Sequence, residues 1–162
     1  MNNLLHVILF EPEIPPNTGN VIRLCANTGA RLHLVQPLGF RLDDRSLMRS
    51  GLDYHDLADV SVHADMEACM AALSGSRIFA VETVGARRYS DVSYRAADAF
   101  LFGPETRGLP SALLDRLGPD HCVRVPMREA NRSLNLSNTV SLVIYEAWRQ
   151  LDFATAQRTS QR

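Results

Sequence analysis

The sequence predicts a single-domain α/β protein with a mainly parallel sheet and helices on both faces. Short apolar strand patterns alternate with amphipathic helix patterns, and no repeat or linker interrupts them. The size agrees, because 162 residues with 46% hydrophobic and 22% charged residues suffice for one globular domain with its own core.

Strand and helix patterns follow one another through the first half of the chain. The apolar run LLHVILF predicts a buried strand over residues 4–10, which Pro15 and Pro16 separate from the next element. Asn17 is predicted to cap a helix that runs to about Thr28, where Gly29 stops it. The remaining predictions are strands at 31–35 and 59–63, a short helix near 43–50 and a helix at 65–73.

The second half continues the alternation and ends in the clearest helix. Strands are predicted at residues 77–82, 99–103 and 122–126, with a helix near 110–117. Ser137 or Asn138 is expected to cap the last helix. Its apolar stripe consists of Val140, Val143, Ile144, Ala147, Trp148 and Leu151. We therefore expect one domain over residues 1–151 and a polar C-terminal tail over 152–162.

The composition excludes several chemistries. All 17 basic residues are arginine, so no lysine can form a Schiff base or serve a phosphate-binding P-loop. Cys25, Cys69 and Cys122 are widely spaced and form no CxxC motif, so we expect buried hydrophobes rather than disulfides or a zinc site. The net charge of −1 does not by itself indicate nucleic-acid binding, although a chain that is nearly neutral can carry a local arginine patch.

The expected compartment is the cytoplasm. No apolar run approaches the roughly 18 residues of a membrane span. The N-terminus also lacks the basic region and the small-residue cleavage site of a signal peptide. We therefore expect no contact with membranes.

Three polar loops follow predicted strands, over residues 11–20, 103–110 and 126–138. Parallel α/β sheets bind ligands at the carboxyl ends of their strands, so these loops form the candidate site. No GxGxxG motif follows the first strand, which argues against a dinucleotide site. In GPETRGLP, Gly103 lets the backbone approach a ligand closely, while the alternative is a plain strand-to-helix turn.

Polar residues in the other two loops exceed what local structure requires. One helix cap needs one residue, yet the third loop holds Asn131, Ser133, Asn135, Ser137 and Asn138. Hydrogen bonding to a ligand and a purely structural loop are the two interpretations. On the first helix, Arg23 shares a polar side with Asn20 and Asn27, and a surface ion pair is the alternative to a functional role.

Three segments resemble, in order, the three motifs of the SPOUT RNA methyltransferase superfamily. They are NTGNVIR at residues 17–23, LFGPETRGLP at 101–110 and VPMREANRSLNLSNTVSLVIYEAWRQ at 125–150. EPEIPPNTGNVIRLCANTGARLHL and GLDYHD are also similar to the minimal, single-domain TrmL (YibK-like) group. Members of that group are tRNA 2′-O-methyltransferases that act on the ribose of the wobble nucleotide, cytidine(34) or uridine(34), of leucine tRNAs.

The resemblance implies a fold, a cofactor and partners. It implies a deep trefoil knot in the C-terminal part, a homodimer, and the anticodon stem-loop of tRNA as substrate. It also implies S-adenosylmethionine as methyl donor, S-adenosylhomocysteine as product, and no metal. The alternatives are a 2′-O-methyltransferase of another tRNA position or of ribosomal RNA, and a non-catalytic module that binds cofactor or RNA.

The resemblance further assigns residues by matched positions. Cofactor contacts are implied for Val81, Thr83, Gly103, Glu105, Val125, Met127, Ser133 and Leu134. The catalytic set is Asn17, Arg23, Glu105 and Asn135. RNA contacts are implied for Arg23, Arg107, Arg128, Arg132 and Tyr145, with Arg87 and Arg88 as further candidates for anticodon-stem phosphates.

Arg23 has two roles open to it. In related enzymes the matching arginine is proposed as a general base, but arginine essentially never loses its proton in proteins. A role that fits its chemistry is to stabilise negative charge on the 2′-oxygen and to bind the adjacent phosphate, while Asn17 and Asn135 orient it and the ribose. An Arg23 side chain turned away from the cofactor pocket would favour the non-catalytic module.

Overall fold

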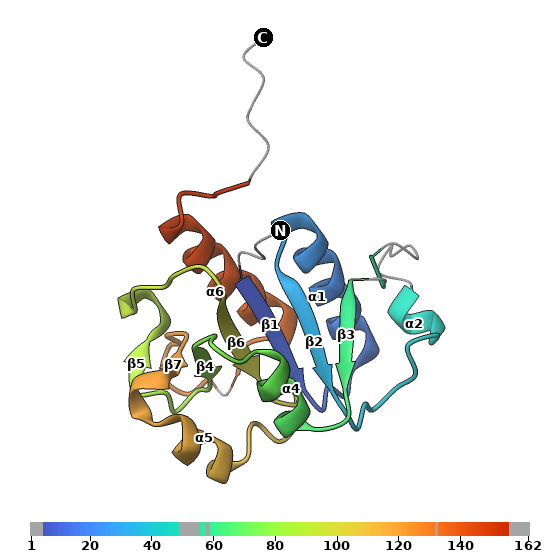
Figure 1. The fold of residues 1–162 in the computed structure, drawn as a ribbon. Helices are drawn as coiled ribbons and strands as arrows, with labels where there is room; N and C mark the ends of the chain where they lie inside the picture. The colour runs from blue at the N-terminus through green and yellow to red at the C-terminus, as the bar shows by residue number, and fades with distance from the viewer. Residues whose placement is uncertain (1–4, 49–55, 58, 132, 156–162) are drawn as a thin grey trace.

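A computed structural model describes residues 5–48, 56–57, 59–131 and 133–155 of the chain. Seven strands form one sheet in the order β3-β2-β1-β6-β4-β7-β5, and every neighbouring pair is parallel, as the sequence predicts (Figure 1). The strands are β1 (Leu5–Phe10), β2 (Arg31–Val35), β3 (Val60–His63), β4 (Ile78–Val81), β5 (Arg87–Arg88), β6 (Asp98–Phe102) and β7 (Cys122–Arg124).

The helices cover both faces of this sheet, which confirms the predicted layers. They are α1 (Pro15–Thr28), α2 (Arg45–Met48), α4 (Met66–Ala72), α5 (Ser111–Leu117) and α6 (Leu136–Gln150), with 3-10 turns at Tyr89–Asp91 and Pro119–His121. None of the helices in the described ranges is long and apolar enough to cross a membrane.

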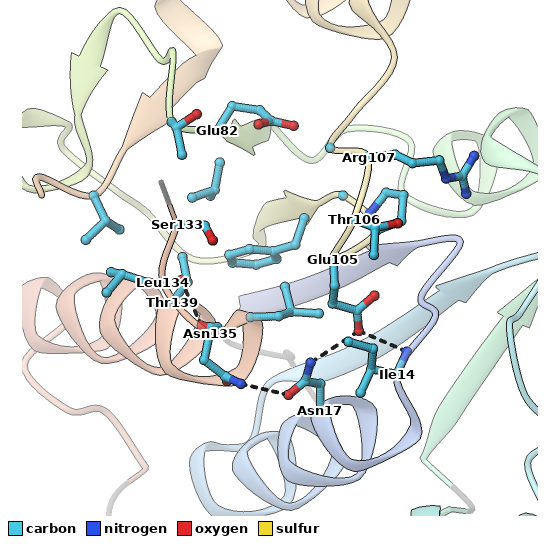
Figure 2. A pocket seen from close by; sticks show the side chains of 18 of the residues that line it. Ile14, Asn17, Glu82, Glu105, Thr106, Arg107, Ser133, Leu134, Asn135 and Thr139 are labelled. Carbon is cyan, nitrogen blue, oxygen red and sulfur yellow. Dashed lines mark hydrogen bonds between the residues drawn. The ribbon is translucent and has the colours of Figure 1, made fainter. Parts of the chain in front are cut away.

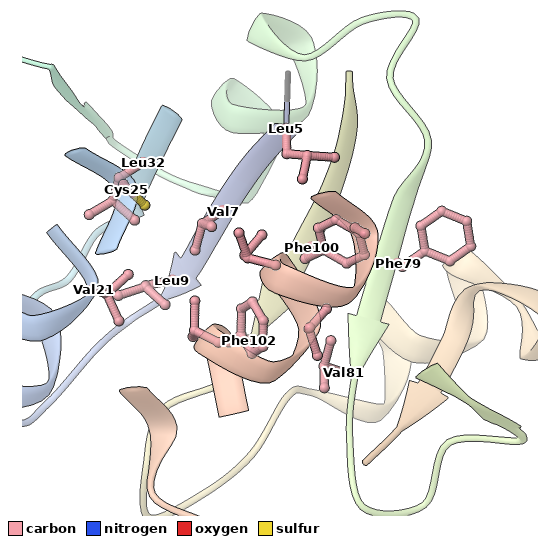
Figure 3. Close-up of a cluster of buried hydrophobic side chains, with 14 of the residues drawn as sticks. Leu5, Val7, Leu9, Val21, Cys25, Leu32, Phe79, Val81, Phe100 and Phe102 are labelled. Carbon is pink, nitrogen blue, oxygen red and sulfur yellow. The ribbon is translucent and has the colours of Figure 1, made fainter. Parts of the chain in front are cut away.

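Alternation along the central strands explains the two-sided core, because successive strand residues point to opposite faces. Val7 and Phe100 belong to the core cluster that α1 and α6 cover (Figure 3). Ile8 and Leu101, one residue further along each strand, belong to the second cluster, which includes residues of α4 and α5. All four side chains are fully buried, which fits a central parallel sheet.

The two predicted helix caps are wrong, each for its own reason. The first helix starts at Pro15, two residues before Asn17, because proline has its φ preset for a first turn and needs no hydrogen bond for its absent N–H. The last helix is capped by Asn135, whose Oδ1 accepts from the N–H groups of Ser137 (2.9 Å) and Asn138 (3.3 Å). A run of short polar residues offers several equivalent caps, and only tertiary contacts choose among them. The predicted stop at Gly29 is confirmed, with φ 77° in the left-handed region.

Two further differences concern short or terminal segments. Strand β5 was not predicted, because it has two charged residues and pairs only with β7. Part of the predicted tail packs back on α6, since Trp148 Nε1 donates to the Ala154 carbonyl (2.9 Å) and the Phe153 ring lies edge-on against Trp148. Leu4, Arg132, most of GLDYHD, the end of the helix predicted near 43–50, and residues 156–162 lie outside the described residues.

A buried ion pair lies at the amino ends of two central strands. Asp98 is 1% exposed and accepts from Arg77 Nε (2.8 Å), Arg77 Nη2 (2.6 Å) and the N–H of Arg95 (2.8 Å). These hydrogen bonds raise the pKa of the Arg77 guanidinium, which also lies 5.1 Å from the centre of the Phe79 ring. The pair therefore joins the starts of β4 and β6 where the chain would otherwise bury a lone carboxylate.

Candidate active site

A cavity of about 540 Å³ opens at the carboxyl ends of β4, β6 and β7. Val81 and Phe102 are the last residues of β4 and β6, and Val125 follows β7 directly; all three line the cavity. The segments after β1, β4, β6 and β7 and the first turn of α6 supply the remaining wall, as the position of ligand sites in parallel sheets predicts. The volume lies within the range typical of small-molecule sites.

Most of the predicted site residues meet in this cavity. All eight residues predicted to contact the cofactor line it: Val81, Thr83, Gly103, Glu105, Val125, Met127, Ser133 and Leu134. Asn17 and Asn135 of the predicted catalytic set line it too, as does Arg107. Their roles stay predictions, since proximity to a cavity does not assign chemistry.

The other predicted residues lie outside the cavity. Arg23 is exposed on α1, roughly 9 Å along the helix axis from Asn17, and does not line the cavity. Arg128 lines a smaller hollow of about 350 Å³ that shares Met127, Ser133 and Leu134 with the main cavity. Tyr145 is 43% exposed on α6, Arg87 and Arg88 form β5, and Arg132 is not described.

The Glu105 carboxylate holds the first motif loop against the second (Figure 2). It accepts from the N–H groups of Glu13 (2.9 Å) and Ile14 (3.2 Å) and from Asn17 Nδ2 (3.4 Å). A carboxylate is favoured here because these groups lie at the N-terminus of α1, where the helix dipole is positive. The resemblance singled out Glu105, but spacing could not reveal its partners, which lie 88 to 92 residues away.

The same network continues into the third motif loop. Asn135 Nδ2 donates to Asn17 Oδ1 (3.0 Å), while Asn135 Oδ1 caps α6. One side chain therefore starts the last helix and also fixes the orientation of the Asn17 amide. Glu105, Asn17 and Asn135 form a continuous polar row along one wall of the cavity (Figure 2).

A second carboxylate also joins these two loops, but it belongs to the loop after β1 and its partner belongs to the loop after β6. Glu13 accepts from the Thr106 hydroxyl (2.8 Å) and the Thr106 N–H (3.3 Å). These hydrogen bonds lower the pKa of Glu13. Arg107 approaches Glu11 (3.6 Å) and Glu13 (4.0 Å), so its guanidinium is held near the rim with 61% of its side chain exposed. Sequence reasoning did not assign Glu13 or Thr106 to the site.

Glycine is required at Gly103 because two stretches of backbone touch there. A Cβ on Gly103 would lie 2.7 Å from the Gly108 carbonyl carbon and from the Leu109 nitrogen. Glu82, a lining residue that was not predicted, accepts from the Leu109 N–H (2.5 Å) and closes the same loop. Its position directly after the β4 strand is the signal that could have identified it, because strand ends point into such sites.

Replacing Gly103 by alanine should weaken ligand binding, because the backbone around Gly108 must move to make room for the added Cβ. Overpacking costs about 1–3 kcal/mol, so if the loop moves to make room we expect affinity for a bound ligand to fall by about 10- to 100-fold. Calorimetric titration with S-adenosylhomocysteine measures this directly. Gly75→Ala is the matched control, because its added Cβ would meet nothing within 4 Å and only its φ of +90° is unfavourable. Equal affinity for Gly103→Ala and the natural chain would contradict the prediction.

The cavity walls divide into apolar and polar parts. Phe102, Leu134 and Val125 supply apolar surface, while the second loop offers backbone polar groups that no Cβ covers at Gly103. Such a site can hold a flat apolar group and fix it through a few hydrogen bonds to the backbone. Binding a ligand of this kind does not require a catalytic acid–base pair in the cavity.

The fold and the cavity define the class: a parallel α/β protein with a candidate small-molecule site at the carboxyl ends of its central strands. The model of the SpoU rRNA Methylase family matches residues 4–145. The tRNA (cytidine(34)-2'-O)-methyltransferase of Methylovorus glucosotrophus (strain SIP3-4) is 58% identical over 153 residues, 94% of this chain and 99% of that protein. The chain therefore belongs to the SpoU methylase family.

Solved structures agree with this family. One structure, which concerns the 2-OH methylation of C/U34 on tRNA, matches with a TM-score of 0.86 and 43% sequence identity. The match covers 93% of this chain and 97% of the chain in that structure. The SpoU methyltransferase AviRb from Streptomyces viridochromogenes, in complex with the cofactor AdoMet, has a TM-score of 0.77 and 26% identity. That match covers 97% of this chain and 60% of AviRb.

Proposed function

We propose that this protein transfers a methyl group from S-adenosylmethionine to the ribose 2′-hydroxyl of the wobble nucleotide, cytidine(34) or uridine(34), of leucine tRNAs. The observation that carries the proposal is the row of Glu105, Asn17 and Asn135, which joins the three motif loops beside a cavity of suitable size. The names of the relatives support the same substrate.

The cavity residues fit S-adenosylmethionine as methyl donor. The apolar wall of Val81, Phe102 and Leu134 suits an adenine ring, and a Cβ at Gly103 would fill space next to the loop backbone. When bound, the donor supplies a methyl group activated by the positive charge on sulfur. We assign the eight lining residues predicted from the resemblance to this role.

The chain's own contribution is chiefly positioning. Asn17 and Asn135 hold each other's amides in fixed orientations, so they can direct an incoming ribose hydroxyl toward the cavity. Holding reactants in place contributes about 7–11 kcal/mol to such reactions. Glu105 acts by fixing Asn17 and the start of α1.

Arg23 is proposed to act on the RNA side. It lies exposed on α1 rather than in the cavity lining, a position that by itself favours the non-catalytic module. The 58% identity to a named tRNA methyltransferase outweighs that sign, so we place Arg23 where it can meet a substrate that approaches from solvent. Its permanent charge suits a phosphate or a developing 2′-oxyanion and does not suit proton abstraction. Arg107, Arg128, Arg132 and Tyr145 are proposed RNA contacts, and a wobble nucleotide is accessible because it lies in a single-stranded loop.

Several wider features belong to the same proposal. A trefoil knot is supported by the sheet order, in which the later strand β7 lies between β4 and β5, the two strands that the earlier segment 82–86 connects. A homodimer is supported by Leu142, an aliphatic side chain that is 43% exposed on α6. We further propose a catalytic domain over residues 1–151, a tail over 152–162, and action in the cytoplasm.

Methyl transfer from radiolabelled S-adenosylmethionine to total bacterial tRNA tests the function and the role of Arg23. We expect label on the wobble 2′-oxygen and a loss of at least about 100-fold in Arg23→Ala, the size typical of removing one transition-state donor. Arg95→Ala is the matched control, because Arg95 is exposed before β6, at the sheet edge opposite the cavity.

Each other outcome overturns a defined part of the proposal. Label at another nucleotide would keep the reaction and refute the wobble target. Binding of S-adenosylhomocysteine without any transfer to tRNA would refute the proposed tRNA activity. Full activity of Arg23→Ala would refute the role of Arg23 alone.

A further inference from the structure

Three histidines form a row across β1, β2 and β3, on the sheet face opposite α1 and α6. His6 Nδ1 lies 3.0 Å from His33 Nε2, and His33 Nδ1 lies 2.9 Å from His63 Nε2. The central His33 is 4% exposed, and burial is the largest cause that lowers its pKa, to about 3. None of the three lines the cavity described above.

A cysteine closes one end of this row. Cys69 lies on α4, which packs on β2 and β3, and its side chain is fully buried. The Cys69 sulfur and one ring nitrogen each from His33 and His63 all lie within 4.8 Å of one another. Two imidazoles and a thiol in one place are the donor set that soft and borderline transition metals prefer.

We propose that His33, His63 and Cys69 bind a transition-metal cation of the Zn²⁺ class at a site separate from the cavity. Zn–N bonds of about 2.0–2.1 Å and a Zn–S bond of about 2.3 Å with tetrahedral angles place two nitrogens about 3.3 Å apart and each nitrogen about 3.6 Å from the sulfur. The two rings, now 2.9 Å apart at their facing nitrogens, must therefore separate slightly and turn toward a common point, which the Cys69 sulfur reaches from within 4.8 Å. Binding displaces the Cys69 thiol proton to solvent. The resulting thiolate offsets the positive charge of nearby Arg31, which acts on His6 and His33.

His6 has a defined part in this site without touching the metal. When His33 Nδ1 binds the cation, the ring proton resides on Nε2, which then donates to His6 Nδ1. Metal-bound imidazoles almost always donate their other N–H to a fixed acceptor in this way. Within the described residues the group of possible ligands has three members, so water would complete a tetrahedral shell.

Titration of the full chain with Co²⁺ tests the site, because a thiolate ligand gives cobalt a charge-transfer absorption that histidines alone do not. We expect one equivalent to saturate this band and Zn²⁺ to abolish it. Cys69→Ala should remove the band, whereas Cys122→Ala, which changes a half-buried cysteine elsewhere, should keep it. His6→Ala should keep the band and weaken the affinity by about 10- to 100-fold.

Two outcomes of the cobalt titration would overturn the proposed metal site. No thiolate band in the natural chain, or a band that survives Cys69→Ala, overturns the proposal and leaves the histidine row as a hydrogen-bonded part of the core. If Cys69→Ala fails to fold, His63→Gln replaces it, because His63 is only half-buried at the end of β3. Binding of S-adenosylhomocysteine should stay unchanged in His63→Gln, which shows that the two sites are independent.

Discussion

Glu105→Ala is expected to lose about 100-fold or more in methyl transfer. The carboxylate holds the Glu13 and Ile14 N–H groups and the Asn17 amide, and a misplacement of about 1 Å in a catalytic group costs on the order of 10²-fold. Hydrogen bonds to a charged group also contribute about 1.5–3 kcal/mol each to stability, so the free energy of unfolding should fall as well.

Single-turnover methyl transfer and urea unfolding separate the two effects. Glu105→Gln restores an acceptor oxygen without the charge, so it should recover stability more fully than activity. Asp115→Ala, which removes an exposed carboxylate on α5, serves as the charge control. Full activity in Glu105→Ala would show that Asn17 keeps its place without this contact.

Asp98→Ala should produce a large loss of stability, about 3–5 kcal/mol in the free energy of unfolding. Removing one partner of a buried ion pair leaves the other without compensation, and the Arg95 N–H also loses its acceptor. Urea unfolding followed by circular dichroism measures the change. The cavity lies at the carboxyl ends of the strands, whereas Asp98 lies at their amino ends. The ligand affinity of the folded fraction should therefore not change.

The matched control is Asp43→Ala, which breaks a pair with Arg41 whose side chains are 85% and 72% exposed. Its unfolding midpoint should stay close to that of the natural chain, because exposed ion pairs contribute little to stability. If both variants unfold at the same urea concentration, burial does not set the contribution of the Asp98 pair.

The strands and their parallel order were predictable because burial on both faces leaves a continuous apolar run. AFLF and IFAV are such runs, and both are central strands. Strand β5 carries no such signal, since Arg87 and Arg88 are charged residues of an edge strand that pairs with β7. Helix starts were less predictable, because Pro15 rather than a capping side chain begins α1 and several neighbouring polar side chains were able to cap α6.

The candidate site was predictable as a set of loops and not as a set of contacts. Strand ends indicated the loops, and the resemblance identified Asn17, Glu105 and Asn135. Their mutual hydrogen bonds depend on which loops the sheet order brings together, and spacing along the chain does not encode that. The exposed position of Arg23 on α1 and the meeting of Cys69 with two histidines required the three-dimensional structure for the same reason.

The polar row along the cavity wall has a consequence for the newly made chain. Asn17 pairs with Glu105, 88 residues later, and with Asn135, 118 residues later. During synthesis this wall of the cavity, the proposed methyl-donor site, therefore cannot form until residue 135 and the helix that it starts have left the ribosome. Incomplete chains should hold no donor, and occupancy of the cavity becomes a marker of a finished molecule.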